Sequence, residues 1–228
     1  MGNGVKGRVF EVFESVQGEG LYLGEKQIFV RMFGCNLSCA FCDTPLNRFI
    51  EYQPQELFEE ILLYNSKEYH SISFTGGEPL LQGGFLKEVF RLTSANGYRN
   101  YLETNGTLVP ELEDIIFYVD IVAMDLKLPS SSSMGNLWSF HRRFLKVARK
   151  KEVFVKAIIC SWTEERDMRE AIKLIGDVDP AITLVLQPNG SEEGPYLDGK
   201  IASYLDICLN ENITACVIPQ IHKVVGIK

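Results

Sequence analysis

Residues 27–44 have the sequence QIFVRMFGCNLSCAFCDT, in which an apolar stretch leads through one glycine into three closely spaced cysteines. The stretch Gln27–Phe33 is rich in β-branched and aromatic residues, which favours a strand. Cys35, Cys39 and Cys42 follow it with the spacing C-x3-C-x2-C. Because three thiolates on one short loop can converge on a single group, this stretch predicts a strand that carries a metal or iron–sulfur site.

Strand-like and helical stretches alternate along nearly the whole chain. Strands are expected at Phe10–Val16, Gln27–Phe33, His70–Thr75, Tyr101–Thr104, Ile121–Leu126, Val153–Ile159, Ile182–Leu186 and Ala215–Ile218. Helices are expected at Pro54–Tyr64, Phe85–Asn96, Pro110–Tyr118, Trp138–Lys150, Glu164–Ile175 and Ile201–Leu209. Six or seven β-then-α units favour a parallel α/β sheet covered by helices.

The length of the chain limits how far such a sheet can close. Eight β/α units usually take about 250 residues. The 228 residues here therefore favour an incomplete barrel of the (β/α)6 type, with a strand or hairpin extension at the N-terminus. No long linker interrupts the pattern, so we expect one domain over residues 1–228.

Composition and charge exclude several classes of protein. The 23 basic and 30 acidic residues give a net charge of −7, which argues against binding to nucleic acid. No apolar run approaches the roughly 18 residues of a membrane span, and residues 1–15 lack the apolar core of a signal peptide. We therefore expect a cytoplasmic protein with neither a nucleic-acid nor a membrane partner. Reduced cysteines are expected there, which favours metal binding or catalysis over disulfides.

We interpret three groups of residues as structural: the remaining cysteines, His141 and a Ser-rich segment. Cys160, Cys208 and Cys216 stand singly in apolar strands or helices, as buried small hydrophobic residues do. A zinc site that borrows one of them or a histidine stays open, although structural zinc normally shows two separated ligand pairs. His141 is interpreted as structural or solvated. Residues 129–136, PSSSSMGN, are expected to form a mobile surface loop, with a functional lid as the alternative.

Two further motifs follow later strands. The motif TGGEP at 75–79 closes the strand after the cysteine loop, and its consecutive glycines let backbone approach a ligand. The motif ETNG at 103–106 closes the next strand; its Glu and Asn suit a ribose or an amino acid, although Asn-Gly is also an ordinary turn. The carboxyl ends of parallel strands meet at one edge of a sheet, so these motifs and the cysteines predict one site there.

The cysteine spacing, with an aromatic residue before the third cysteine, and the GGE motif resemble the radical S-adenosylmethionine (SAM) superfamily. The resemblance implies that Cys35, Cys39 and Cys42 hold a [4Fe–4S] cluster whose remaining iron chelates SAM. One electron from the cluster would then cleave SAM to methionine and a 5′-deoxyadenosyl radical. The SAM contacts implied are Gly77, Glu78, Glu103, Asn105, Asp125, Lys127, Gln187, Pro188, Asn189 and Gly190.

A narrower resemblance is to the family of 7-carboxy-7-deazaguanine synthases of queuosine biosynthesis. The matching motifs are ESVQGEG at 14–20, FVR at 29–31, CDT at 42–44, QP at 187–188 and QIHK at 220–223. The resemblance implies a lyase that converts 6-carboxy-5,6,7,8-tetrahydropterin to 7-carboxy-7-deazaguanine with loss of ammonia and regenerates SAM. The substrate contacts implied are Val16, Gln17, Gly18, Glu19, Arg31, Thr75, His222 and Lys228.

The residue types fit that chemistry. Gln17 and Glu19 offer an amide and a carboxylate to the aminopyrimidine edge of a pterin, with a polar turn as the alternative. Arg31 would bind the substrate carboxylate as a fork, unless it is an ordinary outward-facing strand residue. Thr44 resembles the family's Mg²⁺ ligand, and one hydroxyl suffices because Mg²⁺ also takes substrate oxygens.

Two departures from the family pattern and two alternatives remain. The segment MDLKLPSSSS differs from other members, which leaves Asp125 and Lys127 open, and LQPNG lacks an acidic residue often seen after Q-P. One alternative is a glycyl-radical-enzyme activase, which would have no use for Gln17, Glu19 or Thr44. The other is a zinc-stabilised binding module without catalysis. The family resemblance further implies an electron donor such as flavodoxin or ferredoxin, and a homodimer.

Overall fold

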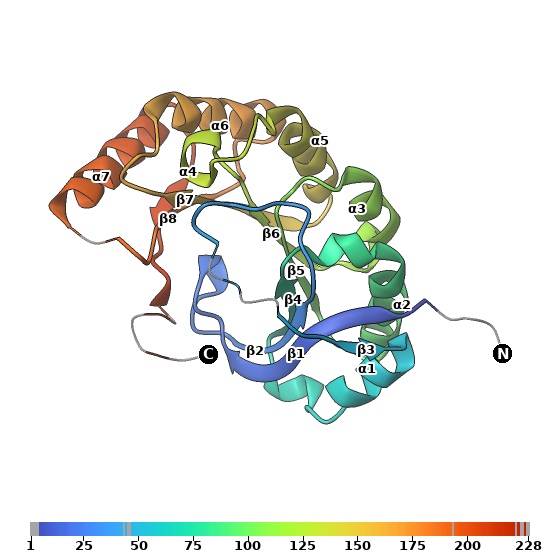
Figure 1. Cartoon of the computed structure of the whole chain (residues 1–228). Helices are drawn as coiled ribbons and strands as arrows, with labels where there is room; N and C mark the ends of the chain where they lie inside the picture. The colour runs from blue at the N-terminus through green and yellow to red at the C-terminus, as the bar shows by residue number, and fades with distance from the viewer. Residues whose placement is uncertain are drawn as a thin grey trace.

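In the computed structural model, residues 5–42, 44, 47–192, 194–221, 223 and 226 are described, and they contain one curved nine-stranded sheet with helices on its outer side (Figure 1). Its strands are β1 (Gly7–Val16), β2 (Lys26–Met32), β3 (Ile50–Tyr52), β4 (Ser71–Gly76), β5 (Asn100–Thr104), β6 (Ile121–Asp125), β7 (Glu152–Ile159), β8 (Leu184–Pro188) and β9 (Ala215–Val217). The strand order is β3-β1-β2-β4-β5-β6-β7-β8-β9.

The pairing confirms the expected incomplete barrel. β1 is antiparallel to β2 and β3, which forms the N-terminal extension. Every pair from β2–β4 to β8–β9 is parallel. Because the described strands end in β3 on one side and β9 on the other, the barrel stays open.

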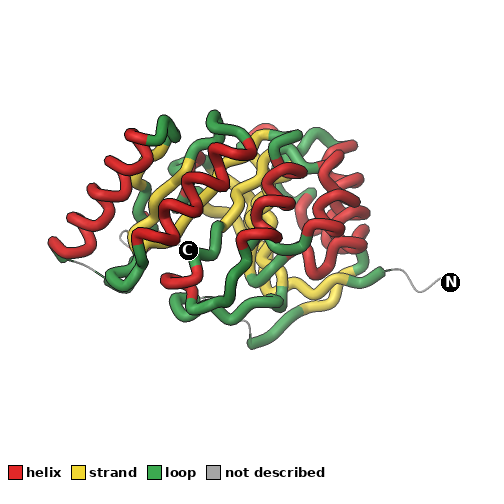
Figure 2. The backbone as a smooth tube through the Cα atoms, turned by 90° about the horizontal axis from the view of Figure 1, so that it is seen from above, coloured by secondary structure: helices red, strands yellow, loops and turns green. Residues whose placement is uncertain are grey.

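Helices follow most of the parallel strands and lie along the outer side of the sheet (Figure 2). They are α1 (Pro54–Ile61), α2 (Gly83–Ala95), α3 (Val109–Ile115), α5 (Trp138–Ala148), α6 (Glu165–Val178) and α7 (Pro195–Asn210). The short helix α4 (Pro129–Ser132) lies instead beside the cysteine loop, to which Ser132 is hydrogen-bonded. The six predicted helices are confirmed. The largest difference is at α7, which begins at Pro195 rather than at Ile201 because proline is well suited to a first helical turn. Among the described residues, no helix combines the length and apolarity that crossing a membrane would require.

The two faces of the sheet differ because side chains alternate along each strand. On β2, for example, Ile28, Val30 and Met32 are fully buried in the main core between sheet and helices. The intervening residues Phe29 and Arg31 face inward, where they line a cavity. Near the amino ends of the strands, the inner face carries a second small core of Tyr101, Ile121, Ala123, Phe154 and Val185. Toward the carboxyl ends, polar and charged residues join apolar ones such as Phe29 and Ile158 around the cavity.

The expectation of a surface loop at 129–136 is wrong for its first half. Residues 129–132 form α4, and Ser131 and Ser132 are only 1% and 0% exposed. Short serine side chains can be buried here because the Ser132 hydroxyl donates a hydrogen bond to the Leu128 carbonyl at 2.7 Å. Sequence periodicity does not show a helix of four residues, just as it did not show β3.

The isolated cysteines follow the expectation with one exception. Cys160 and Cys208 are fully buried, as expected of small hydrophobic residues. Cys216 is only half-buried because it lies on β9, which ends the described sheet and has a neighbouring strand on one side alone.

Candidate active site

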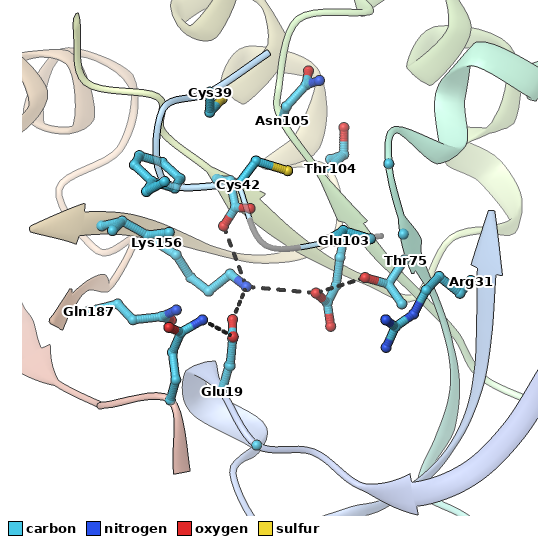
Figure 3. A pocket seen from close by; sticks show the side chains of 18 of the residues that line it. Glu19, Arg31, Cys39, Cys42, Thr75, Glu103, Thr104, Asn105, Lys156 and Gln187 are labelled. Carbon is cyan, nitrogen blue, oxygen red and sulfur yellow. Dashed lines mark hydrogen bonds and ion pairs between the residues drawn. The ribbon is translucent and has the colours of Figure 1, made fainter. Parts of the chain in front are cut away.

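A cavity of about 460 Å³ lies at the carboxyl ends of the parallel strands (Figure 3). Its wall combines inward side chains of the strands with the loops that follow them. The predicted site residues that line it are Val16, Gln17, Gly18, Glu19, Arg31, Cys35, Cys39, Cys42, Thr44, Thr75, Gly77, Glu103, Asn105, Asp125, Lys127, Gln187 and Asn189. The parallel register thus brings the separate sequence motifs to one place.

Five predicted residues are not placed at this wall, and one of them is Glu78, which lies behind it. His222 and Lys228 lie outside the described residues. Pro188 and Gly190 are described but lie beside the cavity-lining residues rather than among them. Gly190 backs onto the C-terminal segment: its N–H donates to Gln220 Oε1 at 3.2 Å, and an added Cβ would lie 2.6 Å from that oxygen.

Glu78 is fully buried behind the cavity wall, and its hydrogen bonds connect two loops. Its carboxylate accepts hydrogen bonds from Leu80 N at 3.0 Å, Thr104 Oγ1 at 2.8 Å and Asn105 N at 2.7 Å. Burial raises the pKa of Glu78 to about 7, although these donors favour the charged form. The buried carboxylate supports the two loops from behind the wall, and the SAM contact expected of Glu78 stays a prediction.

The turn after β4 requires glycine at Gly76. This residue has φ of +117°, and an added Cβ would lie 2.4 Å from the Met32 carbonyl oxygen. The backbone of β4 therefore passes closer to β2 than any side chain would permit. The next amide, Gly77 N, donates to the same carbonyl at 3.2 Å, which leaves Gly77 at the cavity wall.

The three cysteines of the C-x3-C-x2-C loop line the same cavity and carry free thiols. Burial raises the pKa of the Cys35 and Cys39 thiols, and the Lys127 ammonium acts against this at both. Among the described residues, no group of three His, Cys, Asp or Glu side chains could hold a single metal ion. Three thiols that come from one loop and line one cavity wall are a donor set that fits a [4Fe–4S] group with one iron left open.

The cysteine loop is held from two sides. From the turn after β5, Asn105 Nδ2 donates to Asn36 Oδ1 at 2.8 Å, and Asn36 Nδ2 donates to Thr107 Oγ1 at 2.9 Å. From α4, the Ser132 carbonyl accepts the Ala40 N–H at 2.9 Å. The ETNG motif and the Ser-rich segment, which the sequence assigned to SAM and to a loop, therefore both support the cysteines.

A charged cluster that the sequence analysis missed lies deeper in the cavity, around Lys156 of β7 (Figure 3). Its Nζ lies 3.0 Å from Glu19 Oε2, 3.4 Å from Asp125 Oδ1 and 3.7 Å from Glu103 Oε2. Burial opposes the charge of Lys156, but the three carboxylates outweigh it and hold the pKa of Lys156 well above its ordinary value. The one sequence signal was a lysine inside the apolar strand VFVKAII.

The QGEG loop is joined to this cluster by amide groups. Gln17 Nε2 donates to Glu103 Oε1 at 2.9 Å, and Thr75 Oγ1 donates to Glu103 Oε2 at 3.2 Å. On the other side, Gln220 Nε2 donates to Glu19 Oε1 at 2.8 Å. Glu103, expected to contact SAM, thus lies together with the residues expected to contact substrate.

Arg31 faces the cavity, so the alternative of an outward-facing strand residue is wrong. Its Nε lies 3.4 Å from Glu11 Oε1, and its guanidinium lies 5.5 Å from the Phe13 ring centroid. Phe13 stacks on Phe29 with 5.2 Å between centroids and 12° between ring planes. Both rings line the cavity, which therefore has a flat aromatic wall beside a guanidinium.

Gln187 supplies an acceptor that a ligand could satisfy. The residue is 1% exposed and lines the cavity, and its Oε1 is buried without a hydrogen bond to any described residue. Buried acceptors in proteins nearly always have a donor. A hydroxyl or N–H of a bound molecule such as SAM would supply one, so this part of the wall fits the cofactor.

We expect His141 to make the folded protein sensitive to acid. Its Nε2 contacts the Asn105 carbonyl oxygen at 3.2 Å, and burial lowers the pKa of His141 to about 4. The unfolded chain binds this proton below about pH 6.5, so the free energy of unfolding should fall by about 3 kcal/mol as pH drops from there to about 4. In urea titrations, His141→Gln should lack this part of the pH dependence. An equal slope in both proteins would contradict the assignment.

Comparison with known proteins gives three findings. The family model of the radical SAM superfamily matches residues 29–183. A 7-carboxy-7-deazaguanine synthase of Geobacter sulfurreducens is 34% identical over 95% of this chain and 96% of that relative, and one of Methanopyrus kandleri is 33% identical over 99% and 98%. The crystal structure of QueE from Escherichia coli has a TM-score of 0.66 and 20% identity over 93% of each chain, which supports the same fold.

Proposed function

Because the chain belongs to the 7-carboxy-7-deazaguanine synthase family of the radical SAM superfamily, we propose that it converts 6-carboxy-5,6,7,8-tetrahydropterin to 7-carboxy-7-deazaguanine and ammonia. It is a radical SAM lyase of deazapurine biosynthesis that uses a [4Fe–4S] cluster and SAM. The observation that carries the substrate assignment is a single cavity lined by the cysteine loop, the QGEG loop and Arg31.

In this proposal one end of the cavity holds the cofactors. Cys35, Cys39 and Cys42 ligate the cluster, and Gly77 and Gln187 belong to the SAM site. A [4Fe–4S] cluster held there would supply the electron that cleaves bound SAM, from which hydrogen abstraction would start. The support is that all five residues line the same cavity, and that the Gln187 acceptor has no described protein donor.

The other part of the cavity suits a flat bicyclic substrate. The stacked rings of Phe13 and Phe29 offer a face for a planar heterocycle. Glu19 and the Gln17 amide suit a ring edge rich in N–H groups, and Arg31 suits a carboxylate. We assign Val16, Gly18 and Thr75 as neighbouring contacts, and His222 and Lys228 as contacts from the C-terminal segment.

Further parts of the proposal rest on the family resemblance. Thr44 lines the cavity, and its hydroxyl is proposed as a Mg²⁺ ligand beside substrate oxygens. We also propose one radical SAM domain over residues 1–228, a homodimer in the cytoplasm, and a small one-electron donor such as flavodoxin or ferredoxin.

Anaerobic turnover tests the proposed function. Reconstituted protein is incubated with SAM, Mg²⁺, dithionite and 6-carboxytetrahydropterin, and the products are identified by mass spectrometry. We expect 7-carboxy-7-deazaguanine without stoichiometric loss of SAM. SAM cleavage without a deazapurine would keep the superfamily and contradict the substrate.

The activase alternative is not favoured by the geometry. It has no use for Gln17 or Glu19, yet both line the cavity and are tied into its charged cluster. An activase should yield no deazapurine in the same incubation.

A further inference from the structure

The ammonium of Lys156 joins carboxylates from three separate elements. Its side chain is 4% exposed, and it faces Glu19 of the loop between β1 and β2, Glu103 of β5 and Asp125 of β6. Glu19 accepts a hydrogen bond from the ammonium at 3.0 Å, and Asp125 and Glu103 lie 3.4 and 3.7 Å away as ion-pair partners. With three carboxylates around it, the ammonium can act on a ligand by holding them in place.

The register between β6 and β7 fixes where the Lys156 side chain lies. Lys156 is paired with Asp125 across β6 and β7, so both side chains leave the sheet on its inner face. Two residues before it on the same face, Phe154 belongs to the small inner core, and two residues after it Ile158 lines the cavity. These apolar neighbours bury the stem of the lysine and leave its charge among the carboxylates.

Two chains of contacts run from Lys156 to the QGEG loop. Through Glu103 it reaches the Gln17 amide, whose oxygen in turn accepts the Glu19 N–H at 3.1 Å. Directly it holds one oxygen of Glu19, while Gln220 holds the other. Lys156 thus contributes to the orientation of both polar side chains of the loop, together with Gln27, which accepts from Gln17, and Gln220, which donates to Glu19.

We propose that Lys156 is the positioning residue of the substrate site: by fixing Glu19 and, through Glu103, Gln17, it aligns the acceptors that receive the N–H-rich ring edge of the carboxypterin. This inference rests on the proposed function for the identity of the ring. Removing one partner from a buried set of charges leaves the others uncompensated, so loss of Lys156 should disturb the carboxylates more than the cofactor end of the cavity.

The pH dependence of the reaction should report this role. The charged and titratable groups that face Lys156 are Glu19, Glu103, Asp125 and Tyr101, with Lys127 beyond Asp125. The Lys127 and Lys156 ammonium groups hold the pKa of Asp125 below its ordinary value, so in Lys156→Met this carboxylate should take up its proton at higher pH. The acidic limb of the kcat/KM profile should therefore move upward by about one pH unit or more.

The test compares Lys156→Met, Lys156→Arg, the charge-compensated double variant Lys156→Met/Glu103→Gln, and Lys173→Met, an exposed lysine of α6, as control. In Lys156→Met we expect KM for the carboxypterin to rise about 30-fold or more, as for truncation of a buried charge pair. Cluster absorbance and SAM affinity should stay near wild type. Lys156→Arg should recover most of the KM, and Lys173→Met should match wild type.

A binding measurement separates this inference from the proposed function. Binding of 6-carboxypterin, followed by its fluorescence, needs no turnover and should weaken in Lys156→Met to the same extent as KM rises. If wild-type protein makes no deazapurine, the proposed function fails. If wild type is active and Lys156→Met shows the same KM, probe binding and pH profile, only the role of Lys156 is refuted.

The double variant covers the case in which Lys156→Met does not fold. It removes one carboxylate together with the ammonium, so the fold should be kept while Glu19 still lacks its partner. We expect its KM to remain raised. Full recovery of KM would mean that Lys156 only balances charge, and would overturn the positioning role.

Discussion

Replacing Cys39 with alanine should remove the iron–sulfur cluster and lower kcat/KM by at least about 1,000-fold. The effect should be this large because the three cysteines hold the cluster together, and the loss of any one of them disables the site. The thiol lines the cavity together with Cys35 and Cys42, on a loop held by Asn36 and Ala40. Two thiolates cannot replace the three that such a cluster uses here.

Iron and sulfide content, visible absorbance and deoxyadenosine formation measure this effect after anaerobic reconstitution. Cys216→Ser is the matched control, because this half-buried cysteine lies on the outermost described strand, β9, away from the cysteine loop. It should keep its iron. Full iron content and turnover in Cys39→Ala would show that another residue completes the ligand set.

The second large effect is expected from Arg31→Met, which should raise KM for the carboxypterin about 100-fold. The guanidinium faces the cavity beside the aromatic wall, and its Nε is buried without a hydrogen bond to a described residue. Glu11 Oε1 lies 3.4 Å from this Nε as an ion-pair partner, and a substrate carboxylate would add hydrogen-bond acceptors to the fork. SAM binding should change little, because Arg31 lies on β2, away from Gln187 of β8.

Comparison with a pterin that lacks the carboxylate makes the test specific. Wild-type protein should bind the carboxylated ring more tightly, and Arg31→Met should lose that preference. Arg143→Met, at an exposed position of α5, controls for loss of positive charge. An unchanged preference in Arg31→Met would remove the arginine from the carboxylate site.

Most elements of the fold could be predicted because their apolar residues recur over many positions. The helix α6, for instance, buries residues on one face along its whole length, and β7 is an apolar run apart from its first residue, Glu152, and Lys156. The missed elements are short: β3 has three residues and α4 has four, too few to show a period.

The candidate site, like the fold, has parts that the sequence could predict and parts that it could not. The three cysteines lie in one short stretch, Cys35 to Cys42, and the glycines of GGEP lie in another. Each stretch has a recognisable spacing, so the sequence alone was enough to find them. Glu78 belongs to the GGEP motif, yet its carboxylate is buried and connects two loops through hydrogen bonds. A motif names the residues of a turn but does not say which way each side chain points.

Local sequence thus determined the order of strands and helices, the cysteine loop and the family. Tertiary structure decided which side chains share the cavity, because that depends on strand register and on the alternation of the two faces. Lys156 illustrates the difference. In sequence it is a single lysine in an apolar strand, and only pairing of β7 with β6 and closure of the QGEG loop bring it to Asp125 and Glu19.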